Sequence, residues 1–62
     1  MEKEYEVKFN YYSKHSKSNK VEKSETFYFV SNDKEISSVA LEYANRLDNE
    51  EYYVLPNTIK EI

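Results

Sequence analysis

The chain of 62 residues contains no cysteine and no glycine, and it has a single proline. Without cysteine it can form neither a disulfide framework nor a thiolate metal site. Without glycine it has no glycine-rich loop to cradle a phosphate, which excludes P-loop and dinucleotide-fingerprint proteins. Every turn must be built from Asn, Ser, Asp or Pro, and we expect Asn19 to take a left-handed conformation at the tightest bend.

Long apolar runs are also missing from the sequence. No stretch approaches the ~20 residues that span a bilayer, and the start, MEKEYEVKFN, lacks the apolar segment of a secretory signal. We therefore expect a cytoplasmic protein that does not act at a membrane. A chain of this length can bury only one thin core, so we expect residues 1–62 to form a single domain.

The charges are distributed unevenly along the chain. The formal net charge is −3, yet residues 13–24 carry four lysines and one glutamate, whereas residues 25–62 carry eight acidic and three basic residues. An acidic whole argues against bulk attraction to nucleic acid, although a basic loop can still contact a phosphate. Seven tyrosines and three phenylalanines are present, so aromatic area must supply much of the buried surface.

Residues 32–47 hold the only helical period that lasts more than two turns. Asn32 is the expected N-cap, with Glu35 reaching back as in a capping box, and Ser31 is the alternative cap. The polar side of this segment faces water, so its apolar stripe must lie on a sheet formed by the rest of the chain. The stripe consists of Ile36, Val39, Ala40, Tyr43, Ala44 and Leu47.

Three segments are predicted to be extended. Residues 4–12 alternate between apolar and polar, which indicates a half-buried strand with its odd-numbered side chains toward the helix. Residues 21–30 are apolar on both sides near their end, which is typical of a central strand or of one beside an interface. Residues 52–55 form the third strand, and residues after Pro56 either extend it or fold beneath the helix. Residues 13–20 form the connecting loop.

The predicted fold is an α+β, two-layer β-β-α-β domain with one helix on one face of a three-stranded sheet. We prefer the strand order 2-1-3, because it makes the new pairing antiparallel and leaves the proline-bearing strand at an edge; 1-2-3 is the alternative. The expected core is Tyr5, Val7, Phe9, Phe27, Phe29, Ile36, Val39, Ala40, Tyr43, Leu47 and one of Tyr53 and Leu55.

The sheet face away from the helix is the first candidate binding site. Three uses compete for it: contact with a partner protein, homodimerisation by packing sheet on sheet, and stacking of single-stranded nucleic acid on the rings. Alternatively the rings only pack on one another. The residues expected there are Tyr12, Tyr28, Val30, Tyr52 and Val54.

The loop supplies a second candidate site, a phosphate-contacting tip formed by Lys14, His15, Lys17 and Lys20. Such a tip is also typical of an ordinary solvated loop, and Glu4 and Glu6 beside the sheet face disfavour nucleic acid there. His15 has no carboxylate or thiolate neighbours in the loop, so we predict no metal, no cofactor and no catalytic residue.

Acidic side chains are the third candidate site. Spaced carboxylates can imitate a phosphate backbone and occupy a nucleic-acid-binding protein, and such binding would weaken at high salt. Without a cleft that raises one of their pKa values, they are not expected to do acid or base catalysis. These residues are Glu35, Glu42, Asp48, Glu50 and Glu51.

A hairpin followed by a helix, with a basic tip, resembles the arm-binding domains of tyrosine recombinases and many short phage-encoded proteins. The resemblance covers architecture and no motif, so it maps no residue onto a functional position. Abundant Lys, Glu, Asn, Tyr and Ile are also typical of AT-rich phage genomes. We therefore predict a non-enzymatic protein-binding accessory protein of phage or mobile-element type that inhibits or modulates a host factor. A nucleic-acid-binding protein and a homodimeric structural protein are the alternatives.

Overall fold

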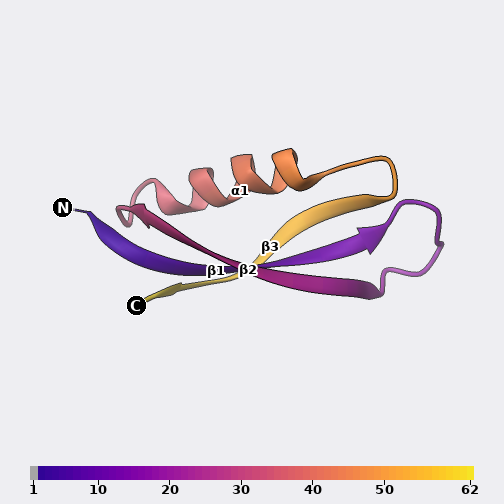
Figure 1. Ribbon diagram of the computed structural model, residues 1–62, viewed down its shortest axis with the longest axis horizontal. Helices are drawn as coiled ribbons and strands as arrows, with labels where there is room; N and C mark the ends of the chain where they lie inside the picture. The colour runs from indigo at the N-terminus through magenta and orange to yellow at the C-terminus, as the bar shows by residue number, and fades with distance from the viewer. Residues whose placement is uncertain (1) are drawn as a thin grey trace.

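The computed structural model describes residues 2–62, which form three strands and one helix in the order β1 (Lys3–Ser13), β2 (Val21–Ser31), α1 (Ile36–Leu47) and β3 (Tyr52–Glu61). The strands pair antiparallel in the order β2-β1-β3. The helix covers one face of the twisted sheet (Figure 1). The predicted α+β architecture and the preferred strand order are confirmed.

The core lies between the helix and the middle strand. The odd-numbered side chains of β1 face α1, as their alternation predicts, and Val7 and Phe9 are fully buried. Phe9 is the central ring, because its centroid lies 5.8 Å from Phe27, 6.2 Å from Phe29 and 5.7 Å from Tyr43. The buried hydrophobic residues are Tyr5, Val7, Phe9, Tyr11, Ile36, Ala40, Ala44 and Val54.

Small residues on α1 determine how it lies on the sheet. Ala40 and Ala44 are one turn apart and buried, and the helix backbone lies closer to β3 and β1 than to β2. On the β2 side the contact is made by the long side chain of Tyr43, whose ring lies 5.1 Å from both Phe27 and Phe29. Strand β2 is therefore covered less completely than β1, and its two phenylalanines are only half-buried.

The helix begins four residues after the predicted cap, at Ile36. Asn32 instead organises the preceding turn: its Oδ1 accepts the Lys34 N–H at 3.0 Å and the Glu35 N–H at 2.9 Å. Glu35 does reach back, but to the side-chain amide of Asn32 at 3.4 Å. The predicted N-cap was therefore wrong: the N-cap of α1 is Glu35, not Asn32 or Ser31, and the Glu35 side chain makes no capping hydrogen bond.

The predicted facing of β3 was wrong. Val54 is buried and Tyr52 packs against the core, so neither lies on the outer face with Tyr12, Tyr28 and Val30. Tyr53 and Leu55 occupy the outer face instead, with Tyr53 opposite Tyr12. The sequence YYVL is apolar at every position, so its alternation cannot tell one face from the other; pairing with β1 does.

Strand β3 continues past Pro56 instead of ending there. Its pairing with β1 runs from Tyr52 to Glu61, and the register shifts between Lys8 and Phe9, where Asn57 is the additional residue. The proline thus sits beside a bulge on an edge strand, which are the two places where a sheet tolerates it. Of the two predicted paths for the last residues, the extended one is correct.

The turns are built without any left-handed residue among residues 2–62, so the conformation predicted for Asn19 is wrong. Side-chain oxygens shape the loops instead. Ser13 Oγ accepts the His15 N–H and Ser16 Oγ accepts the Ser18 N–H, each at 3.1 Å. After the helix, Asn49 Oδ1 accepts two backbone N–H groups, those of Glu51 and Tyr52, at 2.8 Å. Serine and asparagine thus replace glycine by bonding to the backbone.

Candidate functional site

The outer face of the sheet carries two separate apolar patches. Tyr28 and Val30 lie at the end where α1 begins and are 61% and 65% exposed. Tyr12 stacks on Tyr53 at the other end, with ring centroids 5.1 Å apart and an interplanar angle of 14°. A polar pair lies between the patches, in which Ser24 Oγ donates to Asn10 Oδ1 at 2.7 Å. The structure therefore does not bring the five predicted residues together as one aromatic surface.

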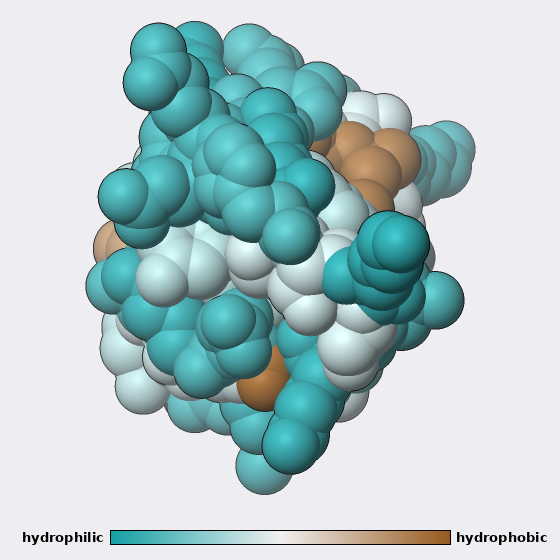
Figure 2. Space-filling model, turned by 90° about the vertical axis from the view of Figure 1, so that its right-hand side faces the viewer, coloured by the Kyte–Doolittle hydropathy of each residue, from teal (hydrophilic) through white to brown (hydrophobic). Residues whose placement is uncertain are grey.

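The lysine tip is accompanied by carboxylates. Lys14 Nζ lies 3.5 Å from Asp48 Oδ1, and the Lys14 N–H donates to the Glu51 carbonyl at 2.8 Å. The acidic segment 48–51 therefore lies beside the start of the basic loop, although the two are far apart in sequence. Figure 2, which views the molecule from this end, shows a mainly hydrophilic surface. His15, Lys17 and Lys20 are exposed in the loop.

The predicted acidic residues are likewise divided between two ends. Glu35 precedes the first turn of α1, whereas Asp48, Glu50 and Glu51 follow its last turn, at the opposite end of the molecule (Figure 1). Glu42 lies on the helix between them and pairs with Arg46 Nη2 at 3.3 Å. A helix of 12 residues separates the two ends by about 18 Å, so these side chains form no single acidic surface.

At the tip end of the sheet, polar side chains cover the core on the β2 side. We call Tyr11, Lys23, Glu25 and Tyr52 the tip-end cluster. The hydroxyl of Tyr11 donates to Glu25 Oε1, and Lys23 Nζ lies 4.5 Å above the Tyr11 ring and 5.5 Å above the Tyr52 ring. Burial, together with the hydrogen bond to Glu25, raises the pKa of Tyr11 to about 12. This hydroxyl therefore stays protonated at physiological pH.

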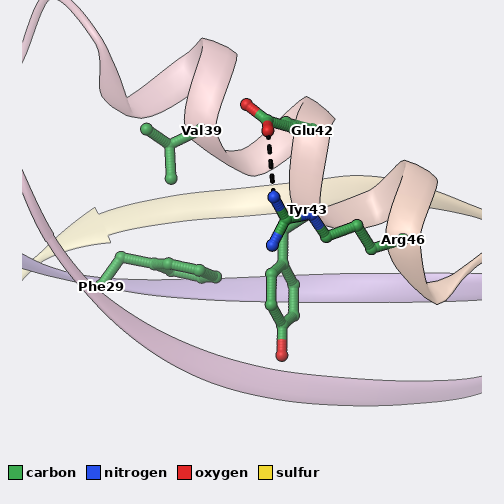
Figure 3. A pocket seen from close by; sticks show the side chains of 5 residues that line it. All are labelled: Phe29, Val39, Glu42, Tyr43 and Arg46. Atoms are coloured by element: carbon green, nitrogen blue, oxygen red, sulfur yellow. Dashed lines mark hydrogen bonds and ion pairs between the residues drawn. The ribbon is translucent and has the colours of Figure 1, made fainter.

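At the other end, a groove lies between α1 and β2. Its volume is ≈ 250 Å³, and Figure 3 shows Phe29 and Tyr43 pointing into the space between helix and strand. The Glu42–Arg46 ion pair lies on the helix side of the groove. The groove exists because α1 lies toward β3 and leaves this side of the sheet to a few long side chains. It is lined by Phe29, Val39, Glu42, Tyr43 and Arg46.

The backbone hydrogen bonds indicate which groups of β2 point away from the sheet. The Ile62 N–H donates to the Glu4 carbonyl at 2.9 Å, so the backbone groups of Glu4 face β3. Because these groups alternate in direction along an antiparallel strand, those of Tyr5 face β2, where Tyr5 is opposite Phe29. The backbone N–H and C=O groups that point outward therefore belong to Thr26, Tyr28 and Val30.

Within residues 2–62 no other strand pairs with this side of β2, which is one edge of the sheet. We call Thr26–Val30 together with the groove the β2 edge site. The strand is unprotected here, because it carries neither proline nor charge in this segment. Sequence reasoning did not place a site at this edge, although it did find the signal: residues 26–30 are apolar on both faces of the strand.

The opposite edge, that of β3, is protected. It contains Pro56 and the bulge at Asn57, and it ends in the charged pair Lys60 and Glu61. Lys3 Nζ lies 3.4 Å from Glu61 Oε1, and this hydrogen bond raises the pKa of Lys3. Bulges, prolines and charges are the common means by which edge strands avoid pairing with another chain. The β2 edge is therefore the one suited to strand addition.

Comparison with protein-family models, with curated proteins and with solved structures gives no match. In the part of the chain that the structure describes, no helix has the length and apolar character needed to cross a membrane. The same residues contain no group of three or more His, Cys, Asp or Glu side chains placed to hold a metal ion.

Proposed function

We propose that this chain is a non-enzymatic protein-binding module that receives a strand of its partner at the β2 edge site. One observation carries the proposal: the outward-facing backbone groups of Thr26, Tyr28 and Val30 lie beside the half-buried side chains of Phe27 and Phe29. In strand addition, main-chain hydrogen bonds supply affinity and adjoining pockets select side chains. Both parts are found at this edge.

The groove fits the role of a side-chain pocket. Sites for small molecules usually measure about 300–1,000 Å³. The volume here, ≈ 250 Å³, is smaller, and it suits one large apolar side chain of an added strand. Phe29, Val39 and Tyr43 would contact that side chain, while the Glu42–Arg46 pair stays at the solvent-exposed rim.

Amide hydrogen exchange with peptides selected from a random displayed library tests this proposal. We expect the amides of Thr26, Tyr28 and Val30 to exchange slowly when a strand is added at the edge, whether that strand comes from a peptide or from another protein molecule. If these amides exchange as fast as those of the loop 15–19 under all conditions, the proposal is wrong. Peptides that protect only the Tyr12–Tyr53 patch would also contradict it.

Proline variants provide a matched control for the same experiment. Tyr28→Pro removes an N–H that points away from the sheet, so it should abolish peptide binding and leave the β1–β2 pairing in place. Glu61→Pro is the control on the other edge, because Glu61 neighbours the bonded pair Glu4–Ile62 and its own N–H also points outward. This second variant should bind peptides as the unmodified chain does.

A further inference from the structure

We infer that the strand received at the β2 edge site is the β2 strand of a second copy of this chain, with the two-fold axis at Tyr28. The inference rests on the proposed function and names its partner. It differs from the face-to-face dimer considered from the sequence, because the two sheets join edge to edge into one continuous sheet. Both helices then lie on the same side of that sheet.

The directions of the backbone groups restrict the register of this pairing. Only even-numbered residues between Thr26 and Val30 point outward, so even-numbered residues must pair with even-numbered residues of the second copy. Centring the pair on Tyr28 places Tyr28 opposite itself and Thr26 opposite Val30. On the helix side it places Phe27 opposite Phe29 at both symmetric positions. Every residue of Thr26–Val30 then has an apolar or β-branched neighbour.

The two neighbouring registers are less favourable. Centring on Phe27 puts Glu25 opposite Phe29 twice, so a carboxylate faces an aromatic ring inside the joined sheet. Centring on Phe29 puts Phe27 opposite Ser31 and leaves Thr26 beyond the last strand residue of the second copy. Only the register at Tyr28 uses all the apolar area of both strands.

In this dimer the second copy adds a lining residue to the groove. Phe27 of the second copy lies next to Phe29 on the helix side, where Phe29 and Tyr43 already line the groove. One strand per copy buries less than the standard interface of about 1,600 Å². We therefore expect a dimer that dissociates on dilution, with a molar mass that rises with concentration between about 1 μM and about 1 mM.

A charge-exchange experiment on the full chain tests the register. Tyr28 is exposed, so Tyr28→Lys and Tyr28→Glu should both fold as the unmodified chain does. In each variant alone, like charges face each other across the axis, and the dissociation constant of the dimer should rise about tenfold. An equimolar mixture of the two should restore dimerisation, because the lysine introduced in one variant then faces the glutamate introduced in the other. Thr58→Lys, on the outer face of β3, is the control.

Light scattering and sedimentation measure the outcome. A chain that is monomeric up to about 1 mM contradicts the inference. If peptides still protect Thr26, Tyr28 and Val30 in that case, the proposed function stands and only the partner is wrong. A dimer that Tyr28→Lys leaves unchanged, or that the mixture of variants does not restore, places the contact elsewhere and also overturns the inference.

Discussion

At the tip end of β2 the helix-facing positions hold Lys23 and Glu25, whereas at the other end the equivalent positions hold Phe27 and Phe29. The two ends of this edge strand therefore differ in whether the side chains that face the helix are charged or apolar. Charges that point inward from an edge strand prevent another strand from pairing there, because pairing would bury them. Only half of β2 is therefore open to a partner, which is why the inferred register is centred at Tyr28.

The open end of β2 packs on one ring, that of Phe9, and removal of this ring should have the largest effect. Phe9 is fully buried and contacts Phe27, Phe29 and Tyr43. We expect Phe9→Ala to lower the free energy of unfolding by about 3–5 kcal/mol, which is most of the stability of a domain this small. Urea unfolding followed by circular dichroism measures the change.

The control for Phe9→Ala is Phe27→Ala. Phe27 belongs to the same aromatic cluster but is only half-buried at the edge, so its truncation leaves a site that water can fill. It should cost clearly less than the loss of Phe9. An equal cost would mean that the open end of β2 is as tightly packed as the centre, and the contrast between the two ends would disappear.

The sequence predicts the position and burial of some elements better than those of others. Strand β1 alternates between apolar and polar residues, so the inward facing of Tyr5, Val7, Phe9 and Tyr11 was predictable, whereas the burial of Asn10 was not. The helix was predictable from its apolar period, and the edge position of the third strand from Pro56. These are local signals, and each is written in the segment that it describes.

What the sequence did not predict depends on contacts between segments. The facing of Tyr52 and Val54 is set by pairing with β1, since their own segment is apolar on both sides. The open groove depends on the small residues Ala40 and Ala44, which let the helix lie close to β3. No motif in the sequence indicates this position of the helix. The two-sided apolar character of residues 26–30 did indicate a central strand or an interface, and the strand order excludes the first.

Two tyrosines of β1 are buried, one toward each end of the strand, and substitution of Tyr11 is expected to have the larger effect on stability. Its hydroxyl donates to Glu25 in the tip-end cluster. Tyr11→Phe removes this charge-assisted hydrogen bond and should destabilise the chain by about 1–2 kcal/mol at neutral pH. Tyr12→Phe, on the outer face, should change stability by no more than about 0.5 kcal/mol.

The effect of Tyr11 should also depend on pH. In the folded chain its pKa is raised to about 12, above its ordinary value of about 10 in the unfolded chain. A raised pKa means that the protonated hydroxyl is favoured by folding, so its contribution is complete below about pH 10 and is lost as pH rises through about 12. The difference in unfolding free energy between Tyr11→Phe and the unmodified chain should therefore shrink over that interval. A constant difference would contradict this assignment.

Tyr5, at the opposite end of the same strand, should respond in the opposite direction. Its side chain is buried, and within residues 2–62 its hydroxyl has no hydrogen-bond partner. A buried hydroxyl without a partner carries a desolvation cost, so Tyr5→Phe should raise the free energy of unfolding by about 1 kcal/mol, or the melting temperature by about 4–8 °C. Calorimetry measures this shift. A fall in melting temperature would mean that the Tyr5 hydroxyl is hydrogen-bonded, for example to an ordered water molecule. The buried tyrosine hydroxyls at the two ends of β1 would then both have partners.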